Sequence, residues 1–102
     1  MILSISPKAV LDMESIGDYI AQDNPVRAVS FIDELYAQCR IINEQPQGYQ
    51  KRPELGDNVR LCAYGRYVIF FTSSEKEVRI ERVLHGARAI KSLWDASDGD
   101  RD

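Results

Sequence analysis

The strongest strand signal in the chain is Tyr67 to Phe71, a run of β-branched and aromatic residues with no charge in it. Because neither face of such a run suits water, it predicts a central strand of a sheet. A shorter apolar segment, Val59 to Ala63, precedes it, and Tyr64-Gly65 between the two allows the chain to reverse. Apolar residues return from Val78 to Leu84 and stop at His85-Gly86. The pattern predicts three consecutive strands in an antiparallel meander.

Two segments in the first half of the chain have apolar residues at three- and four-residue steps, the period of an amphipathic helix. Before them, Met1 to Ser6 alternates and predicts a short strand that joins the sheet. The first helix is expected to begin at Pro7, with Ser6 as its N-cap, and to end near Gln22. Its predicted apolar stripe is Val10, Met13, Ile16 and Ile20. Its acids, expected on the opposite face, are Asp12, Glu14 and Asp18.

The second helix is predicted to begin directly after the first. Asn24 supplies an N-cap and Pro25 a fixed φ at the first helical position. The apolar stripe lasts to about Glu44, and Pro46 cannot continue the helix. Because the link between the two helices is so short, they are expected to form an antiparallel hairpin whose apolar stripes pack on the sheet.

The segment from Gln45 to Asn58 contains two prolines and two glycines and follows neither period. It is predicted to be a loop, long enough to suggest a role in function. Ala87 to Trp94 predicts a last short helix, and the acidic residues 95–102 predict a disordered tail. The expected fold is therefore one α+β domain over residues 1–94, with an N-terminal strand, a helical hairpin packed on an antiparallel meander, and a short C-terminal helix.

The composition is that of a soluble globular protein with one core, since 44% of the 102 residues are hydrophobic and 28% charged. No apolar run approaches the roughly 18 residues of a membrane span, and the N-terminus lacks a signal-peptide pattern. We therefore expect a cytoplasmic protein with no membrane partner. Cys39 and Cys62 lie inside apolar patterns and are expected to be reduced packing residues.

The net charge of −3 is unevenly distributed. Residues 1–45 carry three basic and seven acidic side chains, residues 46–91 nine basic and five acidic, and residues 92–102 one basic and four acidic. A basic sheet region beside an acidic helical half suits an acidic or anionic partner, although the same charges also make an ordinary solvated surface. Its arginines and tyrosines would serve nucleic-acid binding only if the fold gathers them on one face.

Few residues are candidates for chemistry. The sequence has no metal-ligand spacing, no glycine-rich phosphate loop and no serine or cysteine beside an obvious base, so we expect neither metal nor cofactor. The single histidine, His85, is either a general base or a structural hydrogen-bonding residue. In an unbroken strand Arg82 would point inward with Ile80. Either it pairs with an acid there, or a bulge turns it outward.

Four motifs occur in order along the chain: DNPVRA from Asp23, RPELG from Arg52, GRYVIF from Gly65 and RVLHG from Arg82. In combination they make residues 3–94 resemble the ParE branch of the RelE/ParE toxin superfamily. The resemblance implies a bacterial type II toxin that is neutralised by a ParD-like antitoxin and that inhibits DNA gyrase without catalysing a reaction. It implies no sequence-specific DNA binding by this chain itself.

Relatives in the RelE branch share the fold but cut messenger RNA on the ribosome, which requires a base, an acid and several cations. By the resemblance, the corresponding positions here are Asn58, Arg60, Tyr67, Arg88 and Trp94. Only Arg60 and Arg88 are cationic, which favours the branch that does not cut RNA. Two alternatives stay open: a ribosome-dependent nuclease that uses Arg60, His85 and Arg88, and an inactive module that only binds the antitoxin.

A domain with so small a core is expected to leave apolar surface along the helical hairpin and at the sheet edge. A partner could add a strand to that edge and lay a helix in the groove. The residues predicted to contact the antitoxin or the target are Arg52, Arg60, Arg82, His85, Arg88 and Trp94. The partner is then expected to be acidic where it meets the arginines.

Overall fold

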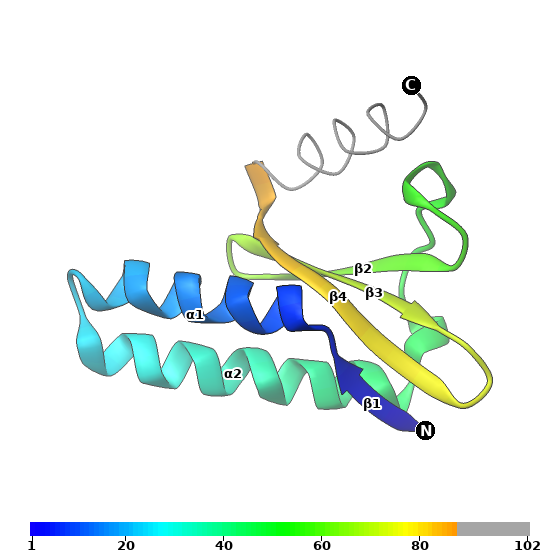
Figure 1. The fold of residues 1–102 in the computed structure, drawn as a ribbon, viewed down its shortest axis with the longest axis horizontal. Coiled ribbons are helices and arrows are strands. Elements are labelled where there is room, and N and C mark those ends of the chain that lie inside the picture. Colours follow the sequence, from blue (N-terminus) through cyan, green and yellow to red (C-terminus); the bar gives the residue numbers. More distant parts are fainter. Residues whose placement is uncertain (88–102) are drawn as a thin grey trace.

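A computed structural model describes residues 1–87 of the chain as one four-stranded sheet with two long helices (Figure 1). The predicted last helix, apart from Ala87, and the predicted tail lie outside the described residues. The elements are β1 (Ile2–Ile5), α1 (Pro7–Ala21), α2 (Pro25–Glu44), the short 3₁₀ turns η1 (Pro46–Gly48) and η2 (Pro53–Leu55), β2 (Val59–Tyr64), β3 (Tyr67–Ser73) and β4 (Glu77–His85). No described helix is long and apolar enough to cross a membrane.

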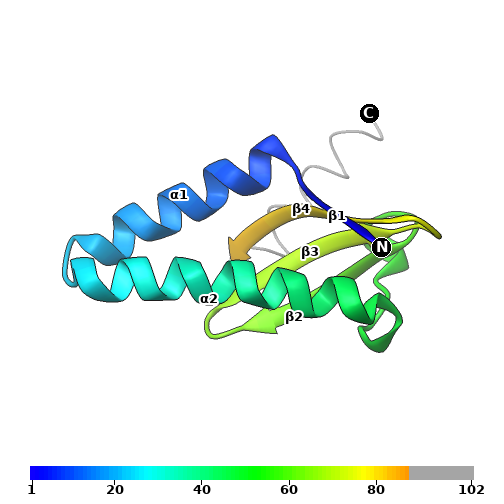
Figure 2. The ribbon, with the colours of Figure 1, turned by 90° about the horizontal axis from the view of Figure 1, so that it is seen from below.

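The order of the strands in the sheet is β1-β4-β3-β2, so the first strand of the chain lies beside the last. β2, β3 and β4 form the predicted antiparallel meander, and β1 adds to it parallel to β4. Both helices pack on the same face of the sheet, and α2 lies in front of the strands in Figure 2. The α+β architecture expected from the sequence is confirmed.

Both helices begin at the residues that the sequence predicts. The Ser6 hydroxyl accepts a hydrogen bond from the backbone N–H of Ala9, and the Asn24 side chain accepts one from Arg27. Each cap satisfies one of the backbone donors that a helix start leaves unpaired. Proline follows each cap at the first helical position, where its missing N–H costs nothing.

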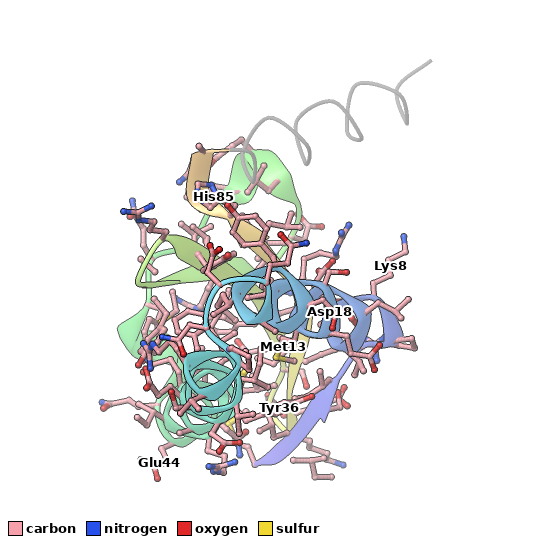
Figure 3. The ribbon with its side chains drawn as sticks, turned by 90° about the vertical axis from the view of Figure 1, so that its left-hand side faces the viewer. Lys8, Met13, Asp18, Tyr36, Glu44 and His85 are labelled. Carbon is pink, nitrogen blue, oxygen red and sulfur yellow. The ribbon has the colours of Figure 1, made fainter. Side chains whose placement is uncertain are left out.

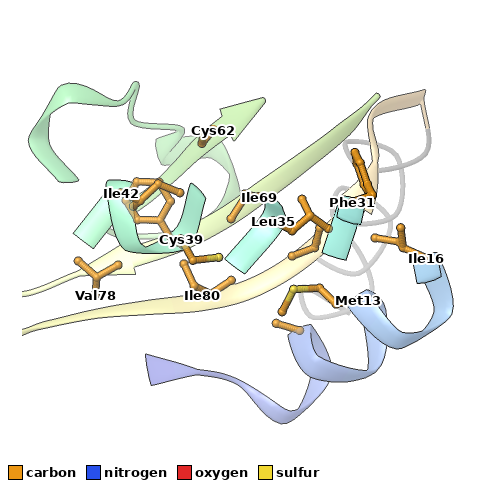
Figure 4. Close-up of a cluster of buried hydrophobic side chains, with 13 residues drawn as sticks. Met13, Ile16, Phe31, Leu35, Cys39, Ile42, Cys62, Ile69, Val78 and Ile80 are labelled. Atoms are coloured by element: carbon orange, nitrogen blue, oxygen red, sulfur yellow. The ribbon is translucent and has the colours of Figure 1, made fainter. Parts of the chain in front are cut away.

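The core lies between the helical hairpin and the sheet (Figure 4). Met13 of α1 and Leu35 of α2 are no more than 1% exposed. Ile69, Phe70 and Phe71 are also buried, and because successive residues of a strand point to opposite faces, water is excluded from both faces of β3. The prediction of a central strand is confirmed.

The two cysteines are free and buried, as the sequence predicted. Burial raises the pKa of the Cys39 thiol to about 11, and burial also raises the pKa of the Cys62 thiol. Both side chains are therefore protonated near neutral pH and act as small apolar residues of the core.

The expectation that Asp12 is a solvent-facing acid of α1 is wrong. Its carboxylate accepts hydrogen bonds from the guanidinium of Arg82 at 2.7 and 3.0 Å and from the backbone N–H of Val83 at 3.0 Å. The cause is the length of β1, which ends opposite Ile80 and leaves the next part of β4 without a neighbouring strand on that side, within residues 1–87. Asp12 occupies that part of the edge, and its carboxylate accepts the hydrogen bond of the Val83 amide.

Arg82 itself combines the two outcomes that the sequence left open. The pairing of β3 with β4 shifts between Phe70 and Phe71, which pair with Arg82 and Ile80. Glu81 is the extra residue of this β-bulge, and the bulge lets both Ile80 and Val83 reach the core although they are three residues apart. Arg82 therefore does not enter the core and turns to Asp12 at the sheet edge.

The segment between α2 and β2 is a loop, as predicted, but part of it is ordered as an extension of the sheet. Lys51 forms an isolated antiparallel bridge with Arg60, and the N–H of Arg52 donates to the carbonyl of Val59 at 2.8 Å. This segment covers the outer edge of the first half of β2. The first half of β2 is therefore already paired and cannot accept a further strand from a partner.

Candidate binding site

The structure separates the predicted site residues instead of gathering them. Arg60 pairs with Phe71 near the end of β3, whereas His85 pairs with Tyr67 at its start. Four residues along a strand correspond to about 13 Å, and the two residues also lie on opposite sides of β3. The sheet therefore does not bring Arg60 next to His85, as a shared reaction centre would require.

Arg52 and Arg60 lie together at the start of β2, and both side chains are engaged in the loop. The Arg52 guanidinium forms an ion pair with Glu54. The Arg60 guanidinium donates through Nη1 to the backbone carbonyl of Tyr49 at 2.7 Å. Within residues 1–87 the buried Nε of Arg60 has no hydrogen-bond partner. The Arg60 side chain holds the loop against the sheet, the Arg52 side chain pairs within the loop, and the role of both in binding a partner stays a prediction.

Arg82 has the strongest internal partner of the predicted arginines. Its hydrogen bond to Asp12 raises the pKa of the Arg82 guanidinium above its ordinary value. The side chain is one-third exposed, so only part of it faces solvent. A charge reversal at Arg82 would disturb the attachment of α1 to β4 as well as any contact with a partner.

His85 lies in a cleft of about 260 Å³ that Tyr19, Arg66 and Tyr67 complete. Figure 3 shows His85 at the end of β4, above α1. Tyr19 comes from the second half of α1, Arg66 from the turn between β2 and β3, and Tyr67 from the start of β3. The sequence analysis did not select Tyr19. The available signal was a tyrosine on the polar side of an amphipathic helix, and in the structure this residue is 68% exposed.

The walls of this cleft are fixed by the strand pairing. The backbone N–H of Gly86 donates to the carbonyl of Arg66 at 2.7 Å, which joins the end of β4 to the β2–β3 turn. The ring of His85 meets that of Tyr67 edge to face, with centroids 5.5 Å apart. The Tyr67 ring packs in turn on Phe31 of α2 at 5.6 Å. Gly65, with φ of +57°, makes the tight turn possible.

A second contact anchors the same turn to α2. The hydroxyl of Tyr64 donates to the Glu34 carboxylate at 2.7 Å, and Arg27 forms an ion pair with that carboxylate. The hydrogen bonds from Arg27 and Tyr64 lower the pKa of the Glu34 carboxyl, and the hydrogen bond to Glu34 raises the pKa of the Tyr64 hydroxyl. The β2–β3 turn is thereby held against the start of α2.

We expect Glu34→Gln to reduce the loss of stability in acid. Because the folded chain favours the ionised form of Glu34, this contribution is complete above the unfolded pKa of about 4.3 and is lost as the pH falls through the lower folded value. The free energy of unfolding, measured with urea from pH 3 to 6, should fall less steeply with acidification in the variant than in the wild type. Asp33→Asn, at the exposed neighbouring position, should retain the wild-type slope. Equal slopes for Glu34→Gln and the wild type would contradict this assignment.

Two predicted site residues, Arg88 and Trp94, lie outside the described residues. Of the six predicted positions, the structure thus places Arg52 and Arg60 at one end of the sheet, His85 at the other, and Arg82 at the edge beside α1. Arg66 and Tyr19 are the neighbours that the fold gives to His85.

Comparison with known proteins gives two findings. The family model described as "ParE toxin of type II toxin-antitoxin system, parDE" matches residues 3–90. A solved structure described as "Chromosomal ParDE TA system from P. aeruginosa" is similar in fold, with a TM-score of 0.72 and 22% sequence identity over 83% of this chain and 95% of that one. A comparison with curated proteins found no match.

Proposed function

The chain belongs to the ParE toxin family of type II parDE toxin–antitoxin systems, and we propose that it acts in the cytoplasm by binding and inhibiting DNA gyrase until a ParD-like antitoxin binds it. The observation that carries this proposal is the separation of Arg60 from His85 across the sheet. Cutting RNA needs an acid, a base and cations around one phosphate. A scaffold that keeps its candidate groups apart is better suited to binding another macromolecule.

Exposed apolar side chains support binding by a protein. Within residues 1–87 the large apolar residues at least half exposed are Met1, Ile2, Leu11, Tyr19, Val26, Val29 and Ile41. They lie on β1 and along the helical hairpin, and the outer edge of β1 has no neighbouring strand within residues 1–87. An antitoxin that adds a strand beside β1 and a helix along the hairpin would cover this surface.

Expression of the chain alone should arrest growth of a bacterial host, and co-expression of the ParD-like protein encoded beside it should restore growth. In vitro, the purified chain should inhibit supercoiling by DNA gyrase, and prior addition of the antitoxin should prevent the inhibition. A heat-unfolded sample is the matched control. Full supercoiling activity with a large excess of the folded chain would exclude gyrase as the target. Codon-phased cleavage of translated messages would instead support the nuclease alternative.

A further inference from the structure

We propose that the cleft formed by Tyr19, Arg66, Tyr67 and His85 binds a single carboxylate side chain presented by a protein partner. The inference rests on the proposed function, because it gives the chemistry of one contact made by a toxin that works by binding. It concerns a place in the molecule that is separate from the arginines at the start of β2.

The polar groups of the cleft lining act as hydrogen-bond donors. Arg66 brings a guanidinium with five N–H groups, and the two tyrosines bring hydroxyls. The Nδ1 atom of His85 accepts a hydrogen bond from the N–H of Ala87 at 3.3 Å, so the neutral ring carries its proton on Nε2 and can donate there. No carboxylate of the described chain lines the cleft or pairs with Arg66. Such a set suits an anion.

The donors are also held in place before a ligand arrives. The backbone of Arg66 is tied to Gly86, and the Tyr67 and His85 rings are in contact across paired strands. Groups that are already ordered lose little conformational entropy when they bind. Tyr19, Arg66 and His85 are all exposed, but the His85 ring contacts Tyr67, so Tyr19 and the end of the Arg66 side chain keep the most freedom to adjust.

Size and charge favour a protein carboxylate over a nucleic acid. At about 260 Å³ the cleft is slightly smaller than typical small-molecule pockets of about 300–1,000 Å³ and suits one side chain. Nucleic acids draw their affinity from many phosphates neutralised together, but among residues 1–87 only Arg66 lines this cleft with a permanent charge. A single carboxylate can instead accept two parallel hydrogen bonds from the Arg66 guanidinium.

The test is a titration of the purified chain, followed by ¹H–¹⁵N NMR, with a capped glycine-serine pentapeptide that has glutamate at its centre. The backbone signals of Arg66, Tyr67 and His85 should shift saturably. Replacing the glutamate of the peptide by glutamine, or Arg66 by alanine, should weaken binding at least tenfold, and Tyr19→Phe a few-fold. Arg40→Ala removes an exposed cation from α2 and should leave the affinity unchanged.

Equal affinity for the glutamate and glutamine peptides, or shifts that survive in Arg66→Ala, would overturn the proposal. Tighter, steeply salt-dependent binding of the single-stranded oligonucleotide dT8 at the same signals would overturn it in favour of a nucleic acid. Because the titration needs neither gyrase nor a living host, its outcome is separable from that of the toxicity assay. If the chain binds the peptide at the cleft but does not inhibit gyrase, the proposed carboxylate site is supported and gyrase is excluded as the target.

Discussion

Replacing Leu35 with alanine should lower the free energy of unfolding by about 3 kcal/mol, because it truncates a large side chain in the core. Leu35 is fully buried where α2 meets the sheet. The variant loses the transfer free energy of two methyl groups and a methine group and leaves a cavity that its well-packed neighbours fill only in part. A loss of this size is a substantial part of the 5–15 kcal/mol that stabilises a typical domain.

The matched control for this prediction is Leu11→Ala, because Leu11 is 61% exposed on the first helix. Both free energies are measured by urea unfolding followed by circular dichroism. The control should change the free energy of unfolding by less than about 0.5 kcal/mol. Similar losses in the two variants would mean that Leu35 is not at the centre of the core.

Asp12→Ala should lower the free energy of unfolding by about 2 kcal/mol. It removes the acceptor of both the Arg82 guanidinium and the Val83 amide, and a donor left without a partner costs about 1–3 kcal/mol. The Arg82 side chain is one-third exposed, so water partly replaces the lost carboxylate, and the cost stays below the 3–5 kcal/mol of a fully buried pair. Urea unfolding near neutral pH measures the difference.

Two further variants test the reason for this cost. Glu14→Gln changes an exposed acid two residues along α1 and should leave stability nearly unchanged. In an Arg82→Met background, Asp12→Ala should cost roughly half as much, because only the Val83 amide is then left without its partner. An undiminished cost in that background would show that the Arg82 pair contributes nothing.

Most of the fold is predictable from the sequence because its signals are local. Ser6-Pro7 and Asn24-Pro25 mark both helix starts, and the uncharged run of β3 marks its burial on both faces. The prediction for Asp12 was wrong because its hydrogen bonds depend on the point where β1 stops pairing with β4, and the Arg82 partner lies 70 residues further along the chain. Helical period describes which residues share a face, but not which part of that face another element covers.

The site was less predictable than the fold for the same reason. Arginine content predicted a basic surface, but not that Arg52 would pair with an acid of this chain or that Arg60 would bind a loop carbonyl. For Arg82 an acid partner was one of two alternatives, but the sequence did not identify that partner as Asp12. Tyr19 and Arg66 come close to His85 only through the tertiary packing of the helical hairpin against the end of the sheet. Side-chain pairing of this kind is a property of the folded chain, which a residue pattern cannot specify.

The position of β1 beside β4 has a consequence for synthesis of the protein. The sheet joins residues about 75 positions apart, as in the hydrogen bond from Ser6 to the carbonyl of Glu81. At translation rates of about 5–20 residues per second, the N-terminal strand waits roughly 4 to 15 s for its partner. The sheet closes only after β4 has left the ribosome, so a product truncated before β4 cannot complete the sheet.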